Sequence, residues 1–139
     1  MATSLVQENS GREVIAFKAR LRLLESMCNP VCTGGYHAEL HTDAVVKQCE
    51  IVDVIEIIGS KKMTPYERPL YLKNGDVVLC RIRVNNSIRV ENFSVDHHLG
   101  RFTIHSAGKT TALGILVELP PVGRLAFPYP ENYYHGTRP

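Results

Sequence analysis

The sequence predicts an all-β protein: a closed six-stranded antiparallel barrel with Greek-key connections. Three observations support this fold class. Several segments alternate apolar and polar residues with a period of two, turn-forming residues separate these segments at short intervals, and no segment has the period of a convincing helix. A closed barrel is preferred to an open sandwich because closure leaves no exposed sheet edge.

The first strands give the clearest pattern. Within residues 17–23, four apolar residues alternate with three basic ones, so one face is apolar and the other is positively charged. The apolar face holds Phe17, Ala19, Leu21 and Leu23, and the basic face holds Lys18, Arg20 and Arg22. A loop rich in glycine follows, and residues 36–41 then alternate in the same way, which predicts a second strand.

Residues 45–58 predict a long strand, although the acidic residues at 50, 53 and 56 recur as on an amphipathic helix. Eight of its fourteen residues are β-branched, which favours a pleated strand, and a bulge or burial on both faces would explain the shifting phase. Residues 59–71 predict a projecting loop, and residues 74–76 predict a turn.

Residues 78–90 predict a hairpin. The residues Val78, Cys80, Ile82 and Val84 would face inward with Arg81 and Arg83 outward. Asn85 and Asn86 would form a two-residue turn, because asparagine tolerates a positive φ, and Ile88 and Val90 would continue the returning strand.

A second hairpin closes the predicted barrel. Phe102 and Ile104 face the core, Ala107 and Gly108 form the turn, and the returning strand carries the alternating series Thr111, Leu113, Ile115, Val117 and Leu119. We expect a flexible segment over 1–13, the barrel over 14–119, and over 120–139 a tail rich in proline and tyrosine. Its aromatic residues could pack on the barrel, but a loosely held terminus is favoured.

Composition adds few constraints on function. The chain has 139 residues, 44% apolar and 22% charged, and its net charge of +2 is too small to imply nucleic-acid binding by itself. No apolar run is long enough to span a bilayer and no signal peptide is evident, so we expect no membrane partner and a cytoplasmic location. The four cysteines are expected to be reduced and mostly buried.

Motifs for catalysis are weak. Residues 108–110 imitate the end of a phosphate-binding loop, but the required glycine five positions earlier is Thr103 and a strand follows instead of a helix. The ligand types of a zinc site occur at Cys28, Cys32, His37 and His41, but their spacing does not fit a zinc finger, and ordinary surface histidines are favoured. We therefore expect no enzyme activity, no cofactor and no metal.

Basic residues are better placed for binding. Lys18, Arg20 and Arg22 share one strand face and Arg81 and Arg83 share another, so these rows could contact phosphates or an acidic protein. The alternative is that these outward positions are charged only for solubility, and no aromatic residues are interleaved for base stacking.

Five segments, in order and spacing, resemble the C-terminal β-barrel shared by elongation factor Tu, elongation factor 1-alpha and the eukaryotic class-II release factor. They lie within residues 17–119, at 17–21, 35–41, 73–76, 91–94 and 99–103, the last reading Leu-Gly-Arg-Phe-Thr. The residues around Cys49 and Thr103 look closer to the release-factor branch. The resemblance implies a non-catalytic module whose GTP-binding domain would precede residue 1, and so no GTP hydrolysis by this chain.

In the release-factor branch, the stretch matching residues 100–106 is implicated in holding the class-I factor that recognises stop codons. The resemblance therefore implies that Arg101, Thr103 and His105 contact a class-I release factor or a related translation factor, with the basic rows beside them. His105 stands where the branch has an arginine, which weakens the donor and makes it sensitive to pH. Two alternatives are contact with tRNA or the ribosome, as in elongation factor 1-alpha, and a truncated paralogue without a selected function.

Overall fold

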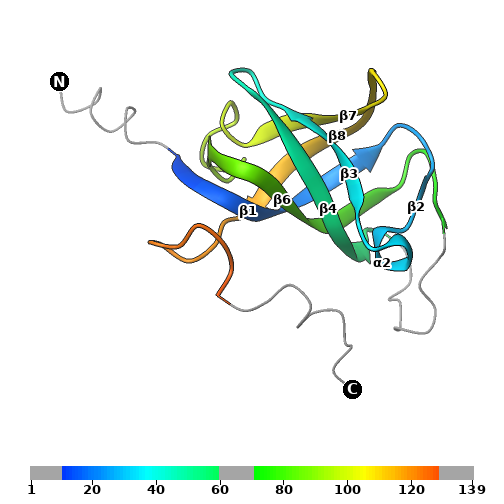
Figure 1. The fold of residues 1–139 in the computed structure, drawn as a ribbon, viewed down its shortest axis with the longest axis horizontal. Coiled ribbons are helices and arrows are strands. Elements are labelled where there is room, and N and C mark those ends of the chain that lie inside the picture. The colour runs from blue at the N-terminus through cyan, green and yellow to red at the C-terminus, as the bar shows by residue number, and fades with distance from the viewer. Residues whose placement is uncertain (1–10, 60–70, 129–139) are drawn as a thin grey trace.

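Six strands close into an antiparallel barrel in the computed structural model, which describes residues 11–59 and 71–128 (Figure 1). Around the barrel the order is β1 (Arg12–Leu23), β6 (Val77–Val90), β4 (Val46–Ile57), β3 (Tyr36–His41), β7 (Arg101–Ser106) and β8 (Lys109–Glu118). A separate two-stranded sheet pairs β2 (Met27–Cys28) with β5 (Tyr71–Leu72), and α2 (Pro30–Thr33) is a single helical turn. The six-stranded antiparallel barrel expected from the sequence is confirmed.

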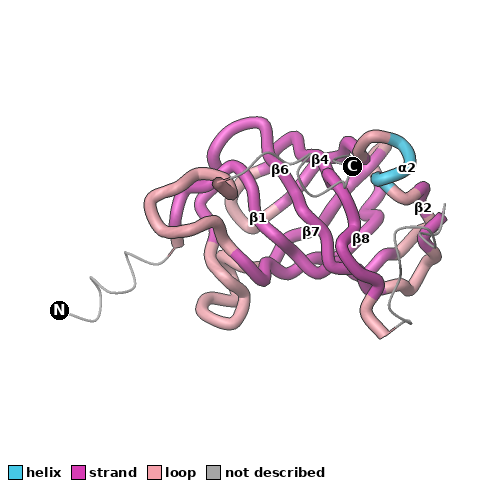
Figure 2. Tube along the Cα trace, turned by 90° about the horizontal axis from the view of Figure 1, so that it is seen from below, coloured by secondary structure: helices cyan, strands magenta, loops and turns pink. Residues whose placement is uncertain are grey.

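The connections are those of a Greek key. The strands β3, β4 and β6 follow one another around the barrel, β1 returns to lie beside β6, and β7 lies beside β3. The view from below in Figure 2 shows the strands enclosing a common interior, with β7 and β8 side by side. No helix among the described residues is both long and apolar enough to cross a membrane.

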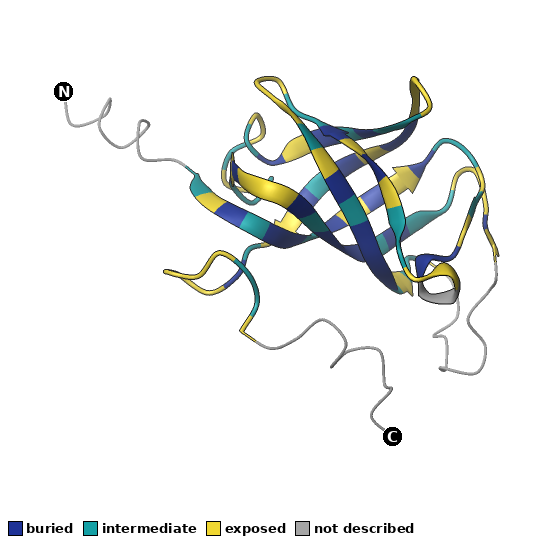
Figure 3. Ribbon diagram, in the orientation of Figure 1, coloured by how far each residue is buried: buried dark blue, intermediate teal, exposed yellow. Residues whose placement is uncertain are grey.

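The core follows the strand alternation. Phe17, Ala19 and Leu21 of β1 are fully buried, whereas Arg20 and Arg22 on the same strand are exposed. Phe102 of β7 meets Phe17 edge to face, with ring centroids 5.7 Å apart, so the two strands are joined through the barrel interior. Figure 3 shows this alternation of buried and exposed positions along the strands.

The strand β4 confirms the prediction over residues 45–58 and explains its irregular phase. Its register against β6 shifts between Ile51 and Asp53 and again between Val54 and Glu56. Val52, Asp53 and Val54 are all buried, so this part of the sheet is covered on both faces (Figure 3). Both explanations offered by the sequence therefore apply.

The hairpin predicted at Asn85 and Asn86 is wrong. β6 is one continuous strand of 14 residues, and these two asparagines lie inside it. The register against β1 pairs Val14 with Ile88 but Ala16 with Arg83, so β6 accommodates extra residues in an exposed bulge instead of turning back. Among the described non-glycine residues only Ala107 has a positive φ, so the two asparagines do not use the conformation from which the turn was predicted.

Residues 120–128 pack on β1, contrary to the favoured expectation of a loosely held terminus. The Arg12 guanidinium donates hydrogen bonds to the carbonyl oxygens of Pro120 and Pro121, and the Ile15 amide donates to Leu125 O at 2.8 Å. Lys18 lies over the ring of Phe127. Tyr129, Tyr133 and Tyr134, the N-terminal residues 1–10 and most of the predicted loop over 59–71 lie outside the described residues.

Candidate docking surface

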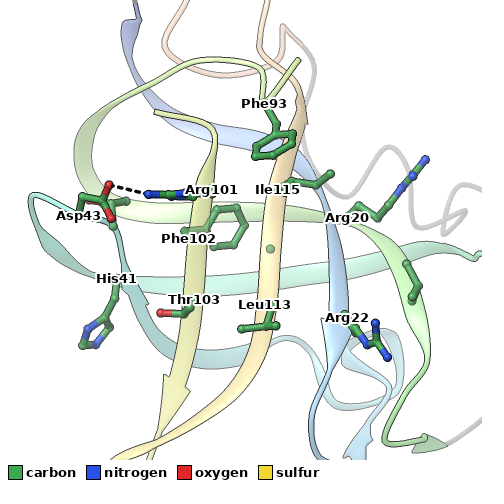
Figure 4. A pocket seen from close by; sticks show the side chains of 13 residues that line it. Arg20, Arg22, His41, Asp43, Phe93, Arg101, Phe102, Thr103, Leu113 and Ile115 are labelled. Carbon is green, nitrogen blue, oxygen red and sulfur yellow. Dashed lines mark hydrogen bonds and ion pairs between the residues drawn. The ribbon is translucent and has the colours of Figure 1, made fainter. Parts of the chain in front are cut away.

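Two rows of side chains cross the outer face of β1, β8 and β7. In the first row, Ile115 of β8 lies between its cross-strand partners, Arg20 of β1 and Arg101 of β7. In the second row, Leu113 lies between Arg22 and Thr103. An apolar stripe on β8 is thus flanked on both sides by polar and basic side chains (Figure 4). We call this face, defined by these six residues, the docking surface.

The apolar stripe was not expected at the surface. Alternating apolar residues on a half-buried strand normally face the core, but here Ala112, Gly114 and Leu116 face inward while Leu113 and Ile115 face outward. Leu113 is 45% exposed. Inside the barrel, a Cβ on Gly114 would come within 2.4 Å of the Phe102 ring, so the inward position between Leu113 and Ile115 has room only for glycine.

A hollow of about 550 Å³ lies over the docking surface. Phe93, from the loop before β7, forms one wall (Figure 4). This loop comes close because position 100 is glycine: a Cβ on Gly100 would lie 2.4 Å from Phe93 Cα. The Phe93 amide also donates to Leu116 O at 2.9 Å. The glycine of the Leu-Gly-Arg-Phe-Thr segment thus shapes the hollow, and Arg101 lines it.

A carboxylate holds Arg101 at the edge of the hollow. Asp43, in the turn between β3 and β4, accepts from Arg101 Nη2 at 3.4 Å, and its Oδ2 lies 3.3 Å from His98 Nδ1. The hydrogen bond with His98 and the positive charge of Arg101 hold the pKa of Asp43 below its usual value of 3.8. All three side chains are more than half exposed, so the contact is one that an incoming ligand could replace.

Two histidines stack beside the docking surface. The ring centroids of His41 on β3 and His105 on β7 are 3.7 Å apart, and the rings lie 24° from parallel. His105 Nε2 is 2.8 Å from Thr103 Oγ1, and His41 Nε2 is 3.1 Å from Glu39 Oε1. His105 is therefore oriented by its neighbours on both strands.

Not all the basic residues singled out in the sequence gather here. Lys18, in the middle of β1, is in an ion pair with Glu118 at 3.1 Å and does not line the hollow. Arg83 lies on another part of the barrel, 3.6 Å from Glu50, its cross-strand partner on β4, and its side chain is 42% exposed. The structure brings together Arg20, Arg22, Arg101 and Thr103, with His105 beside them.

The expectation that Arg81 faces solvent is wrong. Arg81 is only 8% exposed, and its Nη1 donates to both carboxylate oxygens of Asp53, at 2.7 and 2.6 Å. This is the region where the bulges of β4 leave both faces of the sheet covered, so alternation no longer predicts exposure. Arg81 therefore cannot contact a partner at the surface of this structure.

The described residues contain no group of three or more histidine, cysteine or acidic side chains that could hold a metal ion. His37 and His41 both lie on the outer side of β3, and Cys28 is exposed on β2. Cys49 and Cys80 are free and buried.

At the tip of the β7–β8 hairpin, Ala107 and Gly108 both have positive φ, as a two-residue turn requires. The Lys109 ammonium forms an ion pair with Glu25 at 2.6 Å. The turn predicted at this position is confirmed.

Residues 16–117 match the sequence profile of the family described as GTP-eEF1A C-terminal domain-like. The chain belongs to this family. An elongation factor 1-alpha of Caldivirga maquilingensis is 30% identical over 105 residues, which are 74% of this chain and 23% of that protein. A eukaryotic peptide chain release factor GTP-binding subunit of Dictyostelium discoideum is 30% identical over 88 residues, which are 63% of this chain and 16% of that protein.

The fold is similar to part of a solved structure. The crystal structure of sup35 complexed with GDP superposes with a TM-score of 0.66 at 20% identity, covering 81% of this chain and 27% of that one. The chain thus spans about a quarter or less of the length of the relatives it matches. The resemblance to the C-terminal barrels of translational GTPases is confirmed, and the docking surface lies within the matched region.

Proposed function

We propose that this chain is a non-catalytic binding module of translation and that its docking surface binds a class-I peptide chain release factor. The observation that supports this is the row Arg20–Ile115–Arg101, in which an apolar side chain on the outer face lies between two arginines. Arginine is enriched at protein interfaces, and the buried centre of an interface is more apolar than the rest of the surface. Relatedness to a release-factor subunit supports the choice of partner, and translation in the cytoplasm is the setting that we propose.

Calorimetric titration of the chain into a class-I release factor tests this proposal. Arg101→Ala should weaken binding about tenfold, because it removes one flank of Ile115. His105→Arg should strengthen binding, since a guanidinium offers a permanent, two-pronged donor next to Thr103. Arg124→Ala, at an exposed arginine of the C-terminal segment, is the matched control and should change nothing. Binding that is insensitive to Arg101→Ala would contradict the proposed site.

Contact with tRNA is a second candidate because Arg20, Arg22 and Arg101 lie on one face. Phosphate contacts would make binding fall steeply as salt rises from about 50 to 200 mM. Protein docking over an apolar stripe predicts a shallow salt dependence. A steep slope with tRNA and no heat with the release factor would favour the RNA reading, and a folded chain that binds neither would favour a module without a selected partner.

A further inference from the structure

The centre of the docking surface is closed to strand addition. β8 is hydrogen-bonded to β1 on one side and to β7 on the other, so its backbone groups are already paired. An extended peptide lying here would gain no main-chain hydrogen bonds and would leave its own backbone unpaired. An α-helix satisfies its backbone internally and can lie on such a face through side chains alone.

The spacing of the side chains suits a helix. The columns that carry Arg20 and Arg101 are two strand spacings apart, roughly 10 Å, which is about the diameter of an α-helix with its side chains. Between them the hollow of about 550 Å³ is floored by Leu113, Gly114 and Ile115. This volume lies within the range of pockets that enclose several apolar groups.

The positive charge at the two edges of the docking surface indicates which side chains a bound helix would carry on its two sides. Within the described part of the chain, the side chains of Arg20 and Arg22 take part in no hydrogen bond or ion pair, so their guanidinium groups are available to a ligand. Among the described residues, the Arg101 side chain is held by the exposed contacts with Asp43 and His98. Guanidinium groups bind carboxylates with two parallel hydrogen bonds, which gives both affinity and orientation.

We propose that the docking surface receives an acidic amphipathic α-helix of the partner, lying along β8. Its apolar stripe, at positions i, i+3, i+4 and i+7, packs on Leu113 and Ile115. Acidic residues on one flank bind Arg20 and Arg22, and an acidic residue on the other flank displaces Asp43 from Arg101. This inference rests on the proposed function and specifies the element of the partner that binds.

The test uses the full chain and a synthetic helical peptide of about 18 residues, long enough to be partly helical in water. The peptide carries a leucine stripe flanked by glutamates, and a control peptide has lysines in place of the glutamates. Fluorescence anisotropy should show binding of the glutamate peptide only. In NMR spectra of the chain, the peptide should change the backbone amide chemical shifts of β1, β7 and β8 and of no other strand. The double variant Arg20→Glu and Arg22→Glu should weaken this binding at least about tenfold and should bind the lysine peptide instead.

Arg124→Glu is the matched control, and melting curves check that each variant is folded. Equal binding of both peptides, shifts elsewhere on the barrel, or an unchanged preference in the double variant would overturn the inference. A release factor that binds without being displaced by the glutamate peptide would overturn it while leaving the proposed function intact. If the glutamate peptide binds but the release factor does not, the result would support the inference and contradict the release factor as the partner. Binding of neither would overturn both.

Discussion

At the scale of single residues, arginines on the neighbouring strands β1 and β6 have opposite environments. Arg20 and Arg22 extend from β1 into solvent, whereas Arg81, equally outward by strand period, is enclosed with Asp53. Two charges removed from water must compensate each other, because a lone buried charge is costly. Strand alternation predicts the face on which a residue lies, but it does not predict whether that face is covered.

The buried pair gives a test of this distinction. Asp53→Asn should destabilise the protein by about 3–5 kcal/mol, since it leaves the buried guanidinium of Arg81 without its carboxylate. Glu50→Gln, which breaks the half-exposed contact with Arg83, should cost no more than about 1 kcal/mol. Urea unfolding followed by circular dichroism measures both changes. Equal losses in the two variants would show that the Arg81 pair is not enclosed in solution.

The buried thiols predict a pH dependence. Burial, and then the charge of Glu50, raise the pKa of Cys49 from 9.0 to about 12, and burial also raises that of Cys80. The folded state therefore favours the protonated thiols, and this stabilisation is complete below pH 9 and is lost as the pH rises towards about 12. Above pH 9, the free energy of unfolding should fall by about 1.4 kcal/mol per pH unit for each thiol.

Urea titrations between about pH 8 and about pH 10.5 measure this slope. A double variant, Cys49→Ala and Cys80→Ala, is the control, because it retains every other group that titrates in the same range. Its stability should fall less steeply with pH than that of the parent chain. If both proteins show the same pH dependence, the thiols are not responsible.

At the scale of elements, the sequence predicted where the strands lie better than it predicted what packs against each strand. The period-two patterns of β1 and β3 located those strands and the faces that they bury in the core. The bulge in β6 was mistaken for a turn because the two asparagines suggested a positive φ, which neither adopts in the strand. The arginines and Thr103 of the docking surface were identified, whereas Leu113 and Ile115 were missed. Their outward orientation depends on Phe102, which fills the barrel beneath β8, and this is information from another strand.

The packing of β8 against Phe102 of β7 can be tested at Gly114. Gly114→Ala places a Cβ where the Phe102 ring lies, so it should destabilise the barrel by about 1–3 kcal/mol. Phe102→Leu alone should also destabilise, because a smaller side chain leaves part of the core unfilled. Urea unfolding of both single variants and the double variant forms a double-mutant cycle. The double variant should be more stable than the sum of the single losses predicts, and strict additivity would contradict contact between the two positions.

At the scale of the whole molecule, closure of the barrel is incomplete at one strand end. β8 pairs with β1 only from Lys18 onward, so the first residues of β1 have no β8 partner. The segment over 120–128 folds back to this edge, where Ile15 donates to Leu125 and Arg12 binds two proline carbonyls. Prolines and a covering loop are common ways to protect a strand edge from pairing with another chain. The docking surface lies at the other end of β1, so edge protection and partner binding are separate properties of one strand.

Comparison of two truncations isolates the covering segment. Removal of residues 120–139 should lower the free energy of unfolding by about 1–3 kcal/mol more than removal of 129–139, because only the first deletes the acceptors of Arg12 and Ile15. With its β1 edge uncovered, the shorter chain should also self-associate with rising concentration, as measured by sedimentation velocity.

Arg12→Met in the full chain should reproduce part of the stability loss without uncovering the edge. Both truncated chains should still bind the glutamate peptide, since Arg20, Leu113 and Ile115 remain. Equal stability of the two truncated chains would mean that residues 120–128 do not hold the edge of β1.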